Sequence, residues 1–285
     1  MGRGTGLQGA MRALPAAALA LLSAASPARA EEPPRRIVSL NKCADQLLLT
    51  LVEPSRIASV SPIAADDFAF MADELARVPA NSGRGETILM EGGDFVLGGA
   101  FGTRTRLDLL RRQGFDTMTL EPWTSLDQGR SEIRKVARRL GADAAGERLI
   151  GEIDAALARA RGIAPPRTVL FVQHGGTTPG RDSVVHEILA AMGLVPYAER
   201  IGLPGGGRVS AERVVADPPD YLLLPSGDAA IAHDQGSAFL HHPALAAAVP
   251  PERRLTVPAR LSLCGGPSTP VLIDTLAAEV RAKVR

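Results

Sequence analysis

The chain has 285 residues, of which 45% are hydrophobic and 22% charged, the proportions of a globular protein with one large or two medium domains. Its 32 basic residues stand against 31 acidic ones, and a net charge of +1 argues against a protein built to bind nucleic acid or an anionic membrane surface. Aromatic residues make up only 4% of the chain, so an aromatic side chain near a binding site is informative.

Residues 1–30 have the pattern of an export signal. Arg3 and Arg12 precede an apolar stretch, residues 13–25, that is too short to span a membrane as a helix. Small residues at Ala28 and Ala30 fit a cleavage site before Glu31. We therefore expect a signal peptide over residues 1–30 and a soluble mature chain in the periplasm. A short membrane anchor or a wrongly assigned start is the alternative.

Short strands alternate with helices in the first half, which predicts a parallel α/β lobe over residues 31–124. The expected strands are residues 36–41, 56–61, 95–98 and 116–120. The expected helices are residues 44–51, 68–76 and 103–113, with another that starts at Gly85.

Two helices are predicted next, over residues 125–161. Ser125 is a good N-cap, and Gln128 three residues later fits a capping box. Gly141 ends the first helix, and Asp143 can cap the second, which would be about 28 Å long at about 1.5 Å per residue. The pair could be a spacer between two lobes, with the second helix as the strut, or an ordinary surface pair in one domain.

The strand and helix rhythm returns over residues 162–285, which predicts a second α/β lobe. Strands are expected at residues 168–173, 221–224 and 254–257, and helices at 183–192, 210–216, 244–248 and 270–283. Residues 174–180 and 205–207 read as glycine-rich loops.

One pattern occurs on both sides of the helical pair. Glu86 is followed eight positions later by Asp94, and Glu212 by Asp220, and each Asp precedes an apolar run. We interpret the Asp residues as the corners between helix and strand. The repeat favours the spacer over an ordinary surface pair, because it implies two similar lobes.

The two cysteines, Cys43 and Cys264, are too far apart in sequence for a CxxC metal unit. An exported chain makes a disulfide plausible, and closing so long a loop is worth about 4–5 kcal/mol in the chain-entropy account. Two separate buried thiols are the alternative.

Together these features resemble the substrate-binding proteins of ABC importers for iron-siderophores and vitamin B12, over residues 36–285. The stretches that carry the resemblance are residues 36–41, 56–61, 86–97, 109–114, the helical pair and 212–224, with 41–46 and 262–267 fitting a subgroup. It implies two parallel-sheet lobes joined by a long rigid helix, with a ligand cleft between them, and a monomer without a cofactor of its own.

The resemblance also implies partners. In that family one exposed Glu on each lobe docks onto arginines of the membrane permease, which works with an ATPase, and Glu86 and Glu212 occupy the matching positions. Two charged anchors on separate lobes would fix the orientation of docking. The alternative is that each is an acid in the first turn of a helix, stabilised by the helix dipole.

Ligand contacts are expected where the strand-end loops of the two lobes face each other. The candidate cleft residues are Lys42, Asp66, Phe101, Arg104, Trp123, His174, Thr177, Arg208 and Gly265. Trp123 could offer its flat face to a corrin, haem or catechol, or could be partly buried against the spacer. Cys43 and Cys264 both fall in these loops, so a bond between them would staple the lobes beside the cleft.

The ligand itself stays open at this point: a ferric siderophore, a related metal chelate, cobalamin or haem. Several loop arginines favour an anionic ferric chelate, namely Arg84, Arg104, Arg181, Arg208 and Arg260. An exported α/β enzyme is less well supported, since the chain lacks a G-x-S-x-G, a G-x-x-x-x-G-K and an H-E-x-x-H motif. A protein for free zinc or manganese would need three or four convergent ligands, and the five histidines are poorly arranged for that.

Overall fold

A computed structural model describes residues 1–2, 32–66, 69–173, 176–226 and 243–285. The chain forms two compact units, Met1–Glu32 and Pro33–Arg285, and all the described helices and strands belong to the second. Residues 3–30 of the expected signal peptide lie outside the described residues. Among the described helices, none has the length and apolar character needed to cross a membrane.

The first lobe is a parallel sheet in the order β2-β1-β3-β4. Its strands are β1 (Ile37–Ser39), β2 (Ile57–Ser59), β3 (Phe95–Gly99) and β4 (Thr117–Leu120). Its helices are α1 (Lys42–Leu51), α2 (Ala72–Leu75), α3 (Gly85–Met90) and α4 (Arg104–Arg112), with a 3₁₀ turn at Pro54–Arg56. Asn41 caps α1 by accepting hydrogen bonds from the Cys43 and Ala44 amides. The predicted alternation is confirmed, although α2 is shorter than the helix expected over residues 68–76.

The second lobe repeats this topology. Its parallel sheet has the order β7-β5-β9-β10. In both sheets the strands therefore follow the order second, first, third and fourth along the chain of the lobe. The strands are β5 (Thr168–Phe171), β7 (Val195–Pro196), β9 (Tyr221–Ser226) and β10 (Arg254–Pro258). The helices are α7 (Val184–Ala191), α8 (Ala211–Ala216), α10 (Pro243–Ala248), α11 (Ala259–Ser262) and α12 (Ser268–Lys283), with a 3₁₀ turn at Pro251–Arg253. The fold class predicted from the sequence is therefore confirmed.

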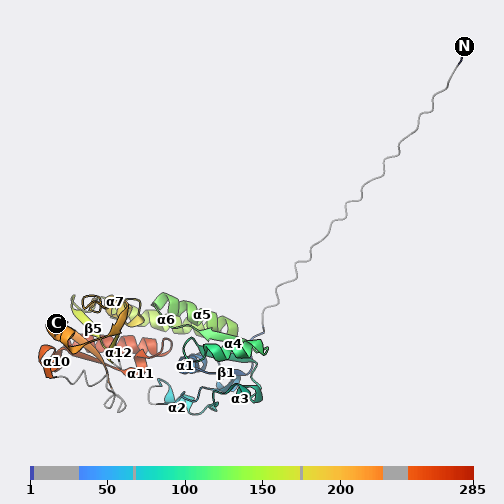
Figure 1. The fold of residues 1–285 in the computed structure, drawn as a ribbon, viewed down its shortest axis with the longest axis horizontal. Helices are drawn as coiled ribbons and strands as arrows, with labels where there is room; N and C mark the ends of the chain where they lie inside the picture. The colour runs from blue at the N-terminus through green and yellow to red at the C-terminus, as the bar shows by residue number, and fades with distance from the viewer. Residues whose placement is uncertain (3–31, 67–68, 174–175, 227–242) are drawn as a thin grey trace. The chain divides into compact units, whose positions relative to one another are not determined.

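The spacer consists of α5 (Leu126–Leu140) and α6 (Asp143–Ala160), which lie side by side (Figure 1). The Ser125 hydroxyl accepts a hydrogen bond from the Gln128 amide, and Gly141 ends α5 in the left-handed conformation, as predicted. Asp143 does not cap α6 but is its first residue, where a carboxylate is stabilised by the helix dipole. Because α6 packs against α1 of the first lobe and against α7 and α12 of the second, it connects the two.

The repeated Asp residues perform the same structural task in both lobes. The Asp94 carboxylate accepts hydrogen bonds from the Arg35 and Arg36 amides, at 2.8 and 2.9 Å, beside β1. The Asp220 carboxylate accepts one from the Thr168 amide at 2.8 Å, at the start of β5. The latter bond is the main reason why the pKa of Asp220 is lowered. Each Asp thus joins its own corner to the first strand of the lobe, which explains the repeat.

Two predicted loops are wrong in detail. Residues 177–179 and 206–207, expected in glycine-rich loops, belong to the antiparallel strands β6 (Thr177–Pro179) and β8 (Gly206–Arg208). The backbones approach so closely that a Cβ at Gly206, whose φ is +81°, would lie 2.6 Å from the Gly180 nitrogen. The structure also has a short helical turn, α11, for which no helix is predicted. The pairing of β6 with β8 depends on contacts between distant segments, which local patterns do not reveal.

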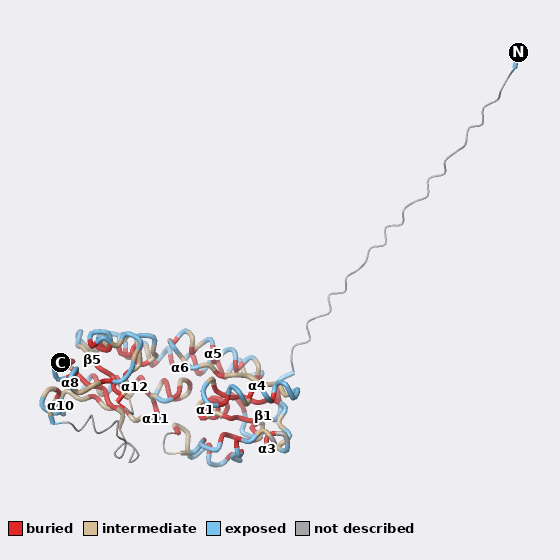
Figure 2. The backbone as a smooth tube through the Cα atoms, viewed as in Figure 1, coloured by how far each residue is buried: buried red, intermediate tan, exposed pale blue. Residues whose placement is uncertain are grey.

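The largest cluster of buried apolar side chains continues through both lobes and the spacer, and each lobe has a smaller cluster of its own. Figure 2 marks the buried residues in red along the backbone. The largest cluster includes Ile37 and Leu47 from the first lobe, Ile150 from α6, and Val169 and Leu276 from the second lobe. Opening the cleft widely would expose part of this cluster to water, at roughly 25 cal/mol per Å² of apolar surface. The packing therefore favours a cleft whose shape is largely preformed.

Candidate functional site

One cavity, with a volume of about 600 Å³, takes its lining from both lobes, and we call it the main cavity. The first lobe supplies the ends of β3 and β4 and the start of α1, and the second supplies the start of α7 and the turn between α11 and α12. The lining is mostly apolar, with amide and hydroxyl groups from Asn41, Gln173, Ser183, Ser262 and Thr269. This volume and this mixture are typical of a site for a small molecule.

Trp123 borders the cavity, but its flat faces are covered by two glycines. A Cβ added at Gly129 of α5 would lie 2.4 Å from the indole Cδ2, and one at Gly265 would lie 2.3 Å from the same atom. Two backbone segments cannot share one side of a ring, so the glycines contact opposite faces. The ring is therefore clamped between the spacer and the second lobe beside the cavity. Contact between Trp123 and a ligand stays a prediction.

Replacing Gly265 by alanine is expected to lower the free energy of unfolding by about 1–3 kcal/mol, because the new methyl group must displace the indole. Urea unfolding followed by circular dichroism measures this change. Gly151→Ala is the control: Gly151 lies in α6 with open space around its Cβ position, so alanine there should stabilise the chain by about 0.5–1 kcal/mol. An equal loss from Gly265→Ala in a Trp123→Ala background would contradict the clamp.

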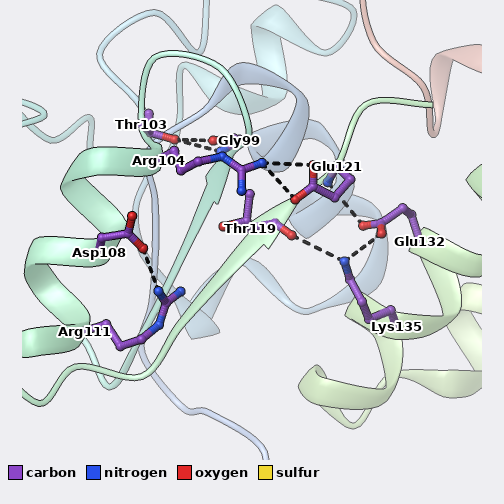
Figure 3. A network of polar contacts seen from close by, with 9 residues as sticks. All are labelled: Gly99, Thr103, Arg104, Asp108, Arg111, Thr119, Glu121, Glu132 and Lys135. Atoms are coloured by element: carbon purple, nitrogen blue, oxygen red, sulfur yellow. Dashed lines mark hydrogen bonds and ion pairs between the residues drawn. The ribbon is translucent and has the colours of Figure 1, made fainter. Parts of the chain in front are cut away.

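A network of charged groups fixes the segment that carries Trp123 (Figure 3). The Arg104 Nη2 lies 3.1 and 3.2 Å from the two carboxylate oxygens of Glu121. The Glu121 amide donates to the buried Glu132 of α5, whose carboxylate also accepts a hydrogen bond from Lys135 at 2.6 Å. Lys135 in turn donates to the Thr119 carbonyl at 3.4 Å. The end of β4 is thereby held against the spacer.

Glu121 is the one ionisable side chain among the described residues that line the main cavity. Its charge is matched by Arg104, whose side chain is more than half exposed. None of the five loop arginines that favoured an anionic chelate lines this cavity, and Arg181 is paired with Glu199 at 3.2 Å. The argument from loop arginines for an anionic ligand is therefore not supported by the geometry of the described residues.

The two cysteines form a disulfide with a Cα–Cα distance of 5.3 Å. Cys43 belongs to the first turn of α1, and Cys264 to the turn between α11 and α12. Both line the main cavity, one from each lobe. The disulfide alternative is thus confirmed, and the bond joins the lobes at the wall of the cleft.

The other predicted cleft residues lie at varying distances from the main cavity. Lys42 borders a smaller neighbouring cavity of about 290 Å³ and forms an ion pair with Asp66. Thr177 and Arg208 are register partners in β6 and β8, and neither is among the residues that line the main cavity. His174 lies outside the described residues. Phe101 and Gly265 line the main cavity directly.

Sequence reasoning missed the start of α7 and the acid Glu121. Ser183 caps α7 by accepting from the His186 amide, and it lines the cavity together with Val184 and Val185. Helix starts that follow strand ends lie at the same edge of a parallel sheet as the loops. The N-cap pattern at Ser183 could therefore have predicted a cavity residue from the sequence. The role of Glu121 could not be predicted in this way, because it depends on the pairing of Glu121 with Arg104.

Among the buried ionisable groups outside the main cavity lining, Asp45 and His186 have shifted pKa values. Burial raises the pKa of Asp45, whose carboxylate accepts hydrogen bonds from the Ser61 amide and hydroxyl. Burial also lowers the pKa of His186 in α7. Neither belongs to a metal site, since the described part of the chain brings together no group of three or more His, Cys, Asp or Glu that could hold an ion.

The two residues expected to dock onto a permease occupy equivalent helices. Glu212 is exposed in the first turn of α8, whose N-cap is Ser210. Glu86 is the second residue of α3, and its side chain lies outside the part that the structure describes. Both helices precede a strand that pairs with the first strand of its lobe.

Two similar lobes, a helical spacer and a cavity between the lobes are features that this chain shares with known proteins. The family described as periplasmic binding protein matches residues 37–248, which is more than half of the chain. The chain belongs to this family. The resemblance drawn from the sequence is thereby confirmed, and the family is one of binding proteins rather than enzymes. No curated protein matches this binding protein.

Several solved structures share the fold of this binding protein. The haem-binding protein RhuT from Roseiflexus sp. RS-1, in apo form, has a TM-score of 0.72 and 26% identity, with 88% of this chain and 99% of that chain covered. A periplasmic haem-binding protein from Pseudomonas aeruginosa has a TM-score of 0.67 and 21% identity, with coverages of 88% and 94%. The vitamin B12-binding protein BtuF of Vibrio cholerae has a TM-score of 0.67 and 16% identity, with coverages of 88% and 98%.

The lobe boundaries at residues 124 and 161 remain predictions.

Proposed function

We propose that this chain is the periplasmic solute-binding component of an ABC importer, which captures a metal chelate and delivers it to an inner-membrane permease. The observation that carries the proposal is the cavity of about 600 Å³ between the lobes, with a largely apolar lining. A free divalent ion needs several convergent side-chain ligands, and the described residues provide no such group. A metal enclosed by an organic chelator needs mainly shape and apolar surface from the protein.

Among chelates, the cavity favours a tetrapyrrole, haem or cobalamin, over a highly anionic ferric siderophore. The described lining contains no arginine or lysine, and its one carboxylate is already paired with Arg104. The similarity to RhuT, a haem-binding protein, points the same way. A ferric siderophore of low charge remains the second candidate, since the apolar lining would accept it equally well.

The ligand class is tested by titrating the purified protein with haemin, cyanocobalamin, a ferric tris-catecholate and ferrioxamine B. Calorimetry reports binding, and Trp123 fluorescence gives a second readout because Trp123 lines the cavity. We expect submicromolar affinity for at least one of the two tetrapyrroles. Failure to bind any of the four, with submicromolar binding of Zn²⁺ or Mn²⁺ alone, would instead identify a free-metal protein.

A further inference from the structure

Two large apolar side chains border the main cavity and yet face solvent. Phe101 of the first lobe is 78% exposed, and Leu263 of the second lobe is 56% exposed. Large apolar side chains are usually buried, because exposure forfeits about 1.5–3 kcal/mol for each. One exposed residue from each lobe at one cavity indicates that a ligand covers both.

The position of Phe101 is fixed by the turn that carries it. The Thr103 hydroxyl donates to the Gly99 carbonyl at 2.7 Å and accepts from the Gly99 amide at 2.9 Å (Figure 3). The Ala100 amide donates to the Leu120 carbonyl at 3.1 Å, and Gly102 turns the chain with a φ of +75°. These bonds hold both ends of a short turn, so the exposed ring does not sit on a long loose loop.

Leu263 is fixed by the covalent bond beside it. It follows α11 and directly precedes Cys264, which is bonded to Cys43 of the first lobe. The residue therefore keeps its place relative to the first lobe even if the lobes flex. Trp123 cannot serve as a stacking surface, because Gly129 and Gly265 cover its two faces. Of the aromatic side chains among the described cavity residues, this leaves Phe101 with an open face.

We infer that Phe101 and Leu263 form an apolar pair that contacts the ligand from both lobes and selects one with a flat conjugated face. This inference rests on the proposed function and deepens it. A planar ring gains offset stacking on Phe101 in addition to apolar burial, whereas a chelate wrapped in saturated chains gains burial alone. Arg104, three residues after Phe101, pairs with Glu121, which lines the same cavity.

The experiment compares variants for haemin, as the flat probe, and for ferrioxamine B, as a probe with saturated chains. We expect Phe101→Ala to weaken haemin binding roughly 30-fold or more, from lost burial and stacking. Phe101→Trp should stay close to the wild type, because it keeps a flat face, and Phe101→Leu should lose several-fold. Leu263→Ala should lose roughly tenfold. Leu109→Ala is the control, an exposed apolar residue of α4 that lies outside the cavity lining.

The outcomes separate the two proposals. A role for the apolar pair is refuted if Phe101→Ala and Leu263→Ala bind haemin within twofold of the wild type. It is refuted equally if Phe101→Leu binds haemin as tightly as Phe101→Trp. It is also refuted if the wild type binds ferrioxamine B as tightly as haemin. A wild type that binds none of the metal chelates tested overturns the proposed function and this inference with it. A folded state for each variant is verified by circular dichroism.

Discussion

Replacing Cys43 and Cys264 together by serine is expected to lower the free energy of unfolding by about 5 kcal/mol, the largest effect of any change considered for this chain. The two residues are 221 positions apart in sequence. A cross-link over so long a loop removes much of the conformational freedom of the unfolded chain, and serine restores that freedom. Urea unfolding of the oxidised wild type and the variant, at equal pH and salt, measures the difference.

The same bond has a consequence for the cleft. Because it joins α1 to the turn before α12 at the cavity wall, the bond limits how far the lobes can separate at this point. We expect the serine variant to release its ligand faster than the wild type, with a smaller change in the rate of association. Stopped-flow dissociation of a bound chelate provides the measurement.

Reduction supplies the control for the disulfide. A thiol reductant should shift the unfolding midpoint of the wild type towards that of the serine variant and leave the variant unchanged. Peptide mapping without reductant should recover Cys43 and Cys264 as one cross-linked fragment. Recovery of two free thiols, or equal unfolding midpoints for the oxidised wild type and the variant, would contradict a stabilising disulfide between the lobes.

Reversing the charge of both docking candidates, with Glu86→Arg and Glu212→Arg, is expected to reduce uptake of the ligand by cells to the background level. On the proposed function, each acid meets a cationic group of the permease, and losing one partner of such a pair costs about 2–5 kcal/mol. Reversal adds repulsion at two places. Affinity for the ligand should stay within twofold, because Glu212 lies in α8, outside the cavity lining, and Glu86 lies in the equivalent helix of the first lobe, α3.

A matched pair of reversals separates docking from a general charge effect. Glu74 of α2 and Glu152 of α6 are both exposed, so Glu74→Arg with Glu152→Arg changes the net charge by the same amount. Uptake assays with labelled ligand should show normal transport for this control. Equal loss in both double variants, or loss of ligand affinity in the Glu86 and Glu212 variant, would argue against docking at those acids.

The sequence by itself determined the architecture, because the features that specify it are local. Ser125 and Gly141 bound α5 as expected, since caps act within a few residues of a helix end. The repeated acid-to-Asp pattern predicted two similar lobes, and the bonds made by Asp94 and Asp220 supply its reason. Hydrophobic periodicity placed most strands and helices for the same reason.

Only the tertiary structure decided the details of the site, because they depend on residues far apart in the chain. The pairing of β6 with β8, the glycine clamp on Trp123 and the ion pair between Arg104 and Glu121 all join separate segments. No local pattern tells an indole whose faces are covered from one that faces a ligand. The cysteines illustrate the limit: two of them in an exported chain suggested a bond, but only the packing of α1 against the α11–α12 turn brings their Cα atoms to 5.3 Å.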